Sequence, residues 1–158
     1  MRTLLFAFAA SLLLAAPAGA AGTSDQLTAP VHQFIDGFNQ GDSKAVNASF
    51  VTTGLTIIDD IPPHVWTGTN ALQTWIKALT AADRTDGKTD QSVTLGTPTR
   101  EISNGARGYL VVPVVYHYKL RGKAEHEPAQ MTFALQKVSA KWLIAGWSWV
   151  GTTPQPGK

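Results

Sequence analysis

Residues 109–119 have the sequence Tyr-Leu-Val-Val-Pro-Val-Val-Tyr-His-Tyr-Lys, in which β-branched and aromatic residues dominate and predict one long strand. Asn104-Gly105, a dipeptide typical of tight hairpin turns, precedes this strand, and Arg121-Gly122 provides a turn after it. The same criteria predict further strands over residues 92–102, 128–137 and 142–150. The second half of the chain is therefore predicted to form a meander of antiparallel strands.

Helices are predicted ahead of these strands. Apolar residues recur at helical spacing over residues 28–40, and Asp42 is suited to cap a second, shorter helix. A third helix is predicted to begin at Thr67 or Thr69 and to be followed by a polar stretch over residues 82–91. Because helices precede a strand meander, the predicted fold class is α+β, with the helices covering one face of a curved sheet.

Large apolar side chains are predicted on both faces of this sheet. Val112, Val114, Tyr116 and Tyr118 share one face of their strand, because side chains alternate along a strand. Two tryptophans likewise share one face of the last strand. A sheet face that is apolar and not covered by helices predicts either a cavity or a homodimer interface.

The two ends of the chain are predicted to lie outside the folded domain. Residues 1–21 have the pattern of a secretory signal peptide, with a positive start, a short apolar run and small residues before the cleavage position. The apolar run is shorter than the ~20 residues that a membrane span needs. We expect one domain over residues 22–151 and a loose, polar tail over residues 152–158.

The composition limits the class of protein. Cysteine is absent, which excludes disulfides and, together with a signal peptide, favours a periplasmic or secreted protein. The formal net charge is +2 and the charges are scattered, so we expect neither nucleic acid nor, after signal cleavage, a membrane as a partner. The histidines lack zinc-ligand spacing and no phosphate-binding glycine loop occurs, so we expect no metal and no cofactor.

A candidate site lies in residues 55–68, Leu-Thr-Ile-Ile-Asp-Asp-Ile-Pro-Pro-His-Val-Trp-Thr-Gly. A short strand is predicted to run directly into Asp59 and Asp60, and two prolines then force an extended turn. Carboxylates at a strand end, beside His64 and Trp66, are typical of a pocket rim. Because neighbouring residues on a strand face opposite sides, we expect Asp59 in the pocket and Asp60 on the outside.

Three motifs, taken in order, carry a resemblance to a known family. They are Phe-Asn-Gln-Gly-Asp at residues 38–42, Trp-Thr-Gly at residues 66–68 and Trp-Leu-Ile-Ala-Gly-Trp at residues 142–147. With this order of elements, the chain resembles the nuclear transport factor 2-like superfamily, and within it the SnoaL-like branch of polyketide cyclases. The resemblance implies a cystatin-like roll, in which a cone-shaped, curved antiparallel sheet wraps around N-terminal helices and leaves a pocket at its open end. It also implies that residues 22–151 form a single SnoaL-like domain.

The superfamily includes ketosteroid isomerases, dehydratases, hydrolases and many non-catalytic modules, so the fold leaves the function open. The catalytic aspartate of the ketosteroid isomerases corresponds to Asp59. Their oxyanion-binding tyrosine corresponds to Phe34, and their protonated aspartate corresponds to Met131 or a neighbour. The loss of both oxyanion donors removes what is usually the largest electrostatic contribution to catalysis. Steroid isomerisation is therefore not expected.

Each candidate residue has a structural alternative. In the functional interpretation, Asp59 is a general acid or base and His64 is its proton shuttle. In the structural interpretation, Asp59 is a solvated carboxylate in a turn, and His64 lies at the rim and bonds to a backbone carbonyl. His117 would enter the cavity or lie at a dimer interface. The residues predicted to form the apolar walls of the ligand-binding pocket are Phe34, Phe38, Trp66, Met131 and Phe133. His117 is predicted as a polar ligand-binding residue.

Two functions follow from these expectations. The first is an exported protein that binds a small hydrophobic molecule in an apolar pocket. The alternative is a pocket enzyme, an isomerase, cyclase, dehydratase or hydrolase, in which Asp59 acts as the general acid or base. The missing oxyanion donors favour binding over catalysis, and either function is compatible with a homodimer that forms through the sheet face.

Overall fold

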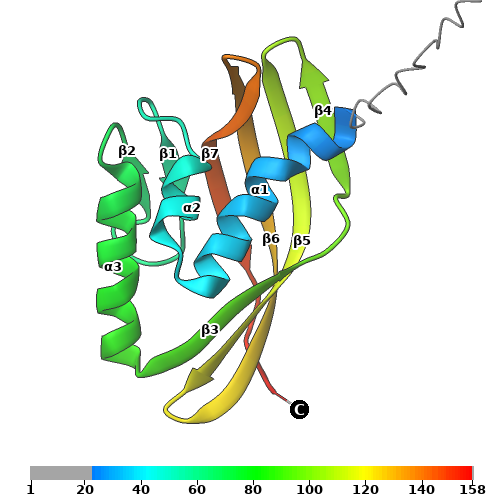
Figure 1. The fold of residues 1–158 in the computed structure, drawn as a ribbon. Helices are drawn as coiled ribbons and strands as arrows, with labels where there is room; N and C mark the ends of the chain where they lie inside the picture. Colours follow the sequence, from blue (N-terminus) through cyan, green and yellow to red (C-terminus); the bar gives the residue numbers. More distant parts are fainter. Residues whose placement is uncertain (1–22, 158) are drawn as a thin grey trace, which may run out of the picture.

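The computed structural model describes residues 23–157, so the predicted signal peptide lies outside the described residues. The elements follow the predicted order, helices first and long strands second (Figure 1). The helices are α1 (Thr23–Gln40), α2 (Ser43–Ala48) and α3 (Ala71–Asp86). The strands are β1 (Thr56–Ile58), β2 (Val65–Thr67), β3 (Lys88–Leu95), β4 (Arg100–Asn104), β5 (Arg107–Leu120), β6 (Lys123–Val138), β7 (Lys141–Gly151) and β8 (Gln155–Pro156).

The strands form one curved sheet in the order β2-β1-β7-β6-β5-β3, with β4 paired to β5 and β8 paired to β6. The predicted α+β class with a curved sheet around N-terminal helices is confirmed, and Figure 1 shows α1 and α2 in front of the sheet. The sheet is mixed, not wholly antiparallel as expected, because β1 pairs in parallel with β7. The connection from β1 to β7 contains β2, α3 and the strands β3 to β6, and a long connection of this kind allows two strands to pair in parallel.

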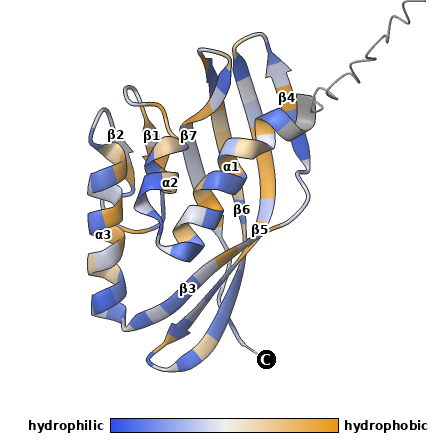
Figure 2. Ribbon diagram, viewed as in Figure 1, coloured by the Kyte–Doolittle hydropathy of each residue, from blue (hydrophilic) through white to orange (hydrophobic). Residues whose placement is uncertain are grey.

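The core lies between α1 and the concave face of the sheet. Phe34 of α1 is only 2% exposed, and Phe133 of β6 and Ile144 of β7 are fully buried. Figure 2 shows hydrophobic residues on the strands and on the helix faces turned toward them, as the helical periodicity predicts. The aromatic ring of Phe34 packs edge-on against Phe50, with ring centroids 4.9 Å apart. This helix therefore places its aromatic residues at the centre of the fold.

Several element boundaries differ from the sequence-based prediction. Helix α1 begins at Thr23 and contains Pro30, where residue 28 was the expected start. Helix α3 includes the first half of the polar stretch predicted over residues 82–91, because most of these polar side chains lie on its exposed face. The helix is followed by Gly87, whose positive φ of 76° is typical of a residue that terminates a helix. The expected strand over residues 92–102 is split into β3 and β4.

The C-terminal tail is partly tied to the sheet. Its residues Gln155 and Pro156 pair with His126 and Glu125 of β6, and the backbone N–H of Gly157 donates to Ala124. The expectation of a loose tail over residues 152–158 is therefore wrong for this part of it, because its backbone is hydrogen-bonded. No helix within residues 23–157 has both the length and the apolar character that a bilayer span requires.

Candidate functional site

A pocket opens between helices α1 and α3 and the concave face of the sheet. It holds about 610 Å³ of empty space, which includes the solvent at its open mouth. Its lining combines aromatic and aliphatic residues with five charged or amide side chains: Phe34, Ile35, Phe38, Asp59, Asp60, Ile61, Trp75, Leu79, Lys88, Gln91, Val93, Tyr116, Glu127, Met131, Trp147 and Trp149. A concave, mostly apolar surface with a few polar groups is the usual form of a small-molecule site.

Asp59 follows the end of β1 and lines this pocket, as the sequence predicts. The indole N–H of Trp75, on α3, donates to Asp59 Oδ2 over 2.6 Å, and the backbone N–H of Asp60 donates to Oδ1 over 2.7 Å. Burial raises the pKa of Asp59 to about 6, although the Trp75 hydrogen bond opposes this rise. The carboxyl can therefore change its protonation state near neutral pH.

Asp60 lines the same pocket, which corrects the expectation that it faces away. Strand β1 ends at Ile58, so the alternation of side chains along a strand no longer applies to the two aspartates. Asp60 is an exposed residue, and its proximity contributes to the raised pKa of Asp59. The acidic doublet therefore supplies two carboxyl groups to one pocket.

Glu127 of β6 is a third carboxyl group in the pocket, and the sequence analysis did not select it. It is 7% exposed, and its pKa is raised first by burial and then by the negative charge of Asp60. The cation of Lys88 and hydrogen bonds from Trp149 and from the backbone of Thr152 oppose this rise. If the predicted strand had begun before Pro128, the alternation of side chains would have placed Glu127 on the same face as Met131, which is the inward face.

A hydrogen-bond network lies at the β3 side of the pocket. The hydroxyl of Tyr116 donates to Gln91 Oε1 over 2.6 Å, and the Gln91 side chain in turn hydrogen-bonds Asp83. Burial strongly raises the pKa of Tyr116, so this side chain stays a neutral hydroxyl throughout the physiological pH range. The network holds the Tyr116 ring against the pocket, so the strand face that Tyr116 shares with Val112 and Val114 is the inward one.

Aromatic rings form much of the pocket wall. Trp75 and Trp147 meet edge to face with centroids 5.0 Å apart, and Tyr116 and Trp149 do the same at 5.9 Å. The indole N–H of Trp147 has no hydrogen-bond partner, although this residue is only 5% exposed. An unpartnered buried donor is uncommon and costs free energy unless a ligand or water accepts from it. The sequence analysis placed two tryptophans on one face of the last strand but could not identify this donor.

The other predicted site residues divide into two groups. Phe34, Phe38 and Met131 line the pocket as expected. Trp66 and Phe133 are buried in the core but are not among the residues that line the pocket, because their strand positions direct them to other parts of the interior. Phe34 and Met131 line the pocket without a hydrogen-bond donor in their side chains. Trp75 and Trp147 contribute indole N–H donors, which the resemblance to ketosteroid isomerases did not indicate.

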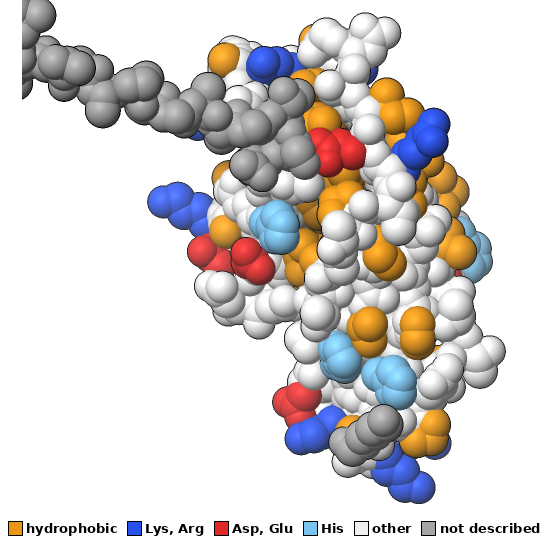
Figure 3. Space-filling view, turned by 90° about the vertical axis from the view of Figure 1, so that its right-hand side faces the viewer, with side chains coloured by type: hydrophobic (Ala, Val, Ile, Leu, Met, Phe, Trp, Pro, Cys, Tyr) orange, Lys and Arg blue, Asp and Glu red, His pale blue; other side chains and the backbone are white. Residues whose placement is uncertain are grey.

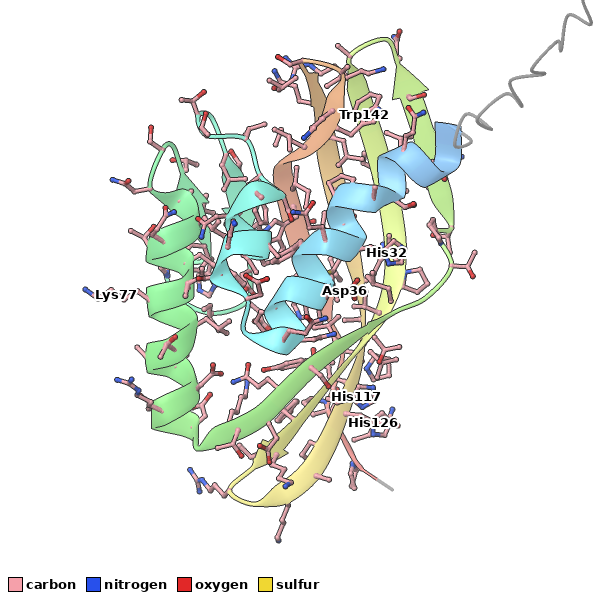
Figure 4. The ribbon with its side chains drawn as sticks, viewed as in Figure 1. His32, Asp36, Lys77, His117, His126 and Trp142 are labelled. Atoms are coloured by element: carbon pink, nitrogen blue, oxygen red, sulfur yellow. The ribbon has the colours of Figure 1, made fainter. Side chains whose placement is uncertain are left out.

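The two predicted histidines lie outside the pocket lining. His64 is exposed, and its Nδ1 is 3.3 Å from the backbone carbonyl oxygen of Asp59, not from the carboxyl group. His117 is exposed and pairs across the strands with His126, and Figure 4 shows the two side by side. Figure 3 shows histidines and scattered hydrophobic side chains on one side of the molecule. Within residues 23–157, no cluster of potential metal ligands occurs.

Solved structures with the same fold define the class of this protein. The hexachlorocyclohexane dehydrochlorinase LinA-type3 of Novosphingobium barchaimii LL02 matches with a TM-score of 0.71 and 7% identity, over 85% of this chain and 90% of that chain. A nuclear transport factor 2-like superfamily protein of Salmonella enterica matches with a TM-score of 0.66 and 14% identity, over 85% and 91%. A ketosteroid isomerase-like protein of Erwinia carotovora atroseptica matches with a TM-score of 0.61 and 14% identity, over 84% and 99%.

The chain thus has the nuclear transport factor 2-like, cystatin-like fold, and the fold predicted from its three motifs is confirmed. No protein-family model matches the sequence, and no curated protein matches it. At identities this low the likeness establishes the fold alone, and the function has to be inferred from the residues that line the pocket.

Proposed function

We propose that this protein is an exported binding protein whose pocket holds a small, largely apolar molecule. The observation that carries the proposal is the combination of aromatic walls with a few hydrogen-bonding groups, Asp59, Tyr116 and the free N–H of Trp147. Apolar walls supply most of the binding free energy, and a few polar groups orient the molecule. Export is checked by the mass of the mature protein, which should lack residues 1–21.

Binding can be tested with phenol, which has an apolar ring and one hydroxyl group. In protein labelled with ¹⁵N at the indoles, phenol should shift the N–H signals of Trp75, Trp147 and Trp149, which line the pocket. The signals of Trp66 and Trp142 should stay in place, because neither residue lines it. Equal shifts at all five indoles would contradict a specific pocket, and no shift at any of them would mean that the pocket does not bind phenol.

A variant at the pocket wall sharpens this experiment. Phe38→Ala removes a half-buried ring from the lining and should weaken phenol binding by about tenfold, the effect of losing ~1.4 kcal/mol of contact. Ile76→Ala is the matched control, because Ile76 is an exposed residue of α3 outside the lining. If both variants bind phenol as the parent does, the site lies elsewhere.

One observation favours catalysis as a second candidate function. The Asp59 carboxyl lines the pocket with a pKa raised to about 6, which suits a general acid or base near neutral pH. If the protein has such an activity, Asp59→Asn should lower kcat by about 10²–10⁴-fold, because the proton acceptor is removed while the contact with Trp75 can persist. Unchanged turnover of an identified substrate would exclude Asp59 from the mechanism.

A further inference from the structure

The pocket carries more negative than positive side chains. Among its lining residues are the carboxyl groups of Asp59, Asp60 and Glu127, and the only cationic side chain among them is Lys88. Within residues 23–157, none of these three carboxyl groups forms a salt bridge. When all four of these groups are ionised, three negative charges and one positive charge leave the pocket lining with a net charge of −2.

The aromatic rings of the same pocket provide faces on which a cation is stabilised. Trp75 and Trp147 meet at 84°, and Tyr116 and Trp149 meet at 82°, so each pair forms a corner with two perpendicular ring planes. The electron-rich face of an indole or phenol ring attracts a cation within about 6 Å of its centroid. At the same end of the molecule, Lys88 Nζ already lies 5.2 Å from the centroid of the Tyr118 ring.

An independent observation points to a hydrogen-bond acceptor in the pocket. The indole N–H of Trp147 is more than nine-tenths buried, belongs to the pocket lining and has no acceptor in the protein. The two buried carboxyl groups of the pocket accept from other indoles, Asp59 from Trp75 and Glu127 from Trp149. A ligand oxygen would satisfy this donor, and a buried donor left without an acceptor is unfavourable.

We infer that the ligand is a small organic cation, a substituted ammonium group on a compact apolar body that also bears a hydrogen-bond-accepting oxygen. The ammonium group would lie between the aromatic corners and the three carboxyl groups, and the oxygen would accept from Trp147. This assignment rests on the proposed function and names the chemical class of its ligand. A neutral apolar molecule would leave the carboxylates in the pocket without a counter-charge.

Two probes of the same shape separate the cation from its apolar body. Choline and 3,3-dimethylbutan-1-ol differ only in the quaternary atom, which is a charged nitrogen in the first and a carbon in the second. At pH 8, well above the pKa of about 6 for Asp59, choline should bind with a Kd at least about tenfold lower than that of the alcohol. The indole signals of Trp75, Trp147 and Trp149 report the binding of each probe.

A charge-removing variant tests the role of the carboxyl groups. Asp60→Asn should reduce the preference for choline over the alcohol severalfold, and this exposed residue can be replaced without disturbing the core. Asp36→Asn is the matched control, because Asp36 is an exposed aspartate of α1 outside the lining (Figure 4). This control should leave the preference unchanged.

The outcomes distinguish the inference from the proposal beneath it. If the alcohol binds as tightly as choline, or phenol binds while choline does not, the cation assignment is wrong and the apolar pocket stands. If phenol, choline and the alcohol all leave the three pocket indoles unshifted, the proposed function fails and the inference fails with it. A preference for choline that Asp60→Asn does not reduce would also overturn the assignment to these carboxyl groups.

Discussion

Phe34→Ala should lower the free energy of unfolding by about 3–5 kcal/mol, the range for removing a fully buried phenylalanine. Phe34 is 2% exposed, and its ring contacts Phe50, Trp75 and Trp147 with centroids 4.9, 6.3 and 6.0 Å away. It therefore joins α1 to the segment after α2, to α3 and to β7. The cavity left by alanine cannot close easily, because three large rings surround it.

Urea denaturation of the variant and the parent protein measures this effect. His32→Ala is the control on the same helix, since His32 is exposed (Figure 4) and its replacement should change the free energy of unfolding by no more than about 0.5 kcal/mol. A loss below about 1 kcal/mol for Phe34→Ala would mean that the ring is not held as tightly as its contacts indicate. The resemblance places Phe34 where ketosteroid isomerases have a tyrosine, and in this chain the position supports the fold.

The local sequence predicted most of the fold because its elements are set by local periodicity and turn residues. The hairpin at Asn104-Gly105 joins β4 to β5 as expected, and the apolar face of α1 packs on the sheet. The parallel pairing of β1 with β7 could not be found in this way, because it joins segments about 90 residues apart that share no local signal.

The candidate site was predictable only in part, for the same reason. Asp59 was found because it follows a recognisable strand, whereas alternation showed which residues share a face of β5 but not which face points inward. Its hydrogen-bond partner Trp75 is on another element, and helical periodicity marks that tryptophan only as a core residue. Glu127 was missed because the predicted strand began at residue 128, although β6 begins at Lys123.

The stability of the protein should fall as the pH rises from about 4 to about 7, in the direction opposite to ordinary acid denaturation. The pKa of Asp59 is 3.8 in an unfolded chain and about 6 in the folded protein. Between these values the folded protein binds more protons than the unfolded chain, so the free energy of unfolding decreases with pH. Asp83 and Glu127 also have raised pKa values, which adds contributions of the same sign.

The Asp59 contribution is fully present below pH about 4 and is lost as the pH rises through about 6, with a magnitude of about 1–3 kcal/mol. Asp59→Asn cannot ionise, so its free energy of unfolding should fall less between pH 4 and pH 7, by that amount, in urea titrations at each pH. The control Asp36→Asn should keep the parent's pH dependence, because Asp36 is exposed and outside the pocket. If Asp59→Asn also keeps it, the Asp59 carboxyl is hydrated like any surface carboxylate, and its place in the binding and catalytic proposals is lost.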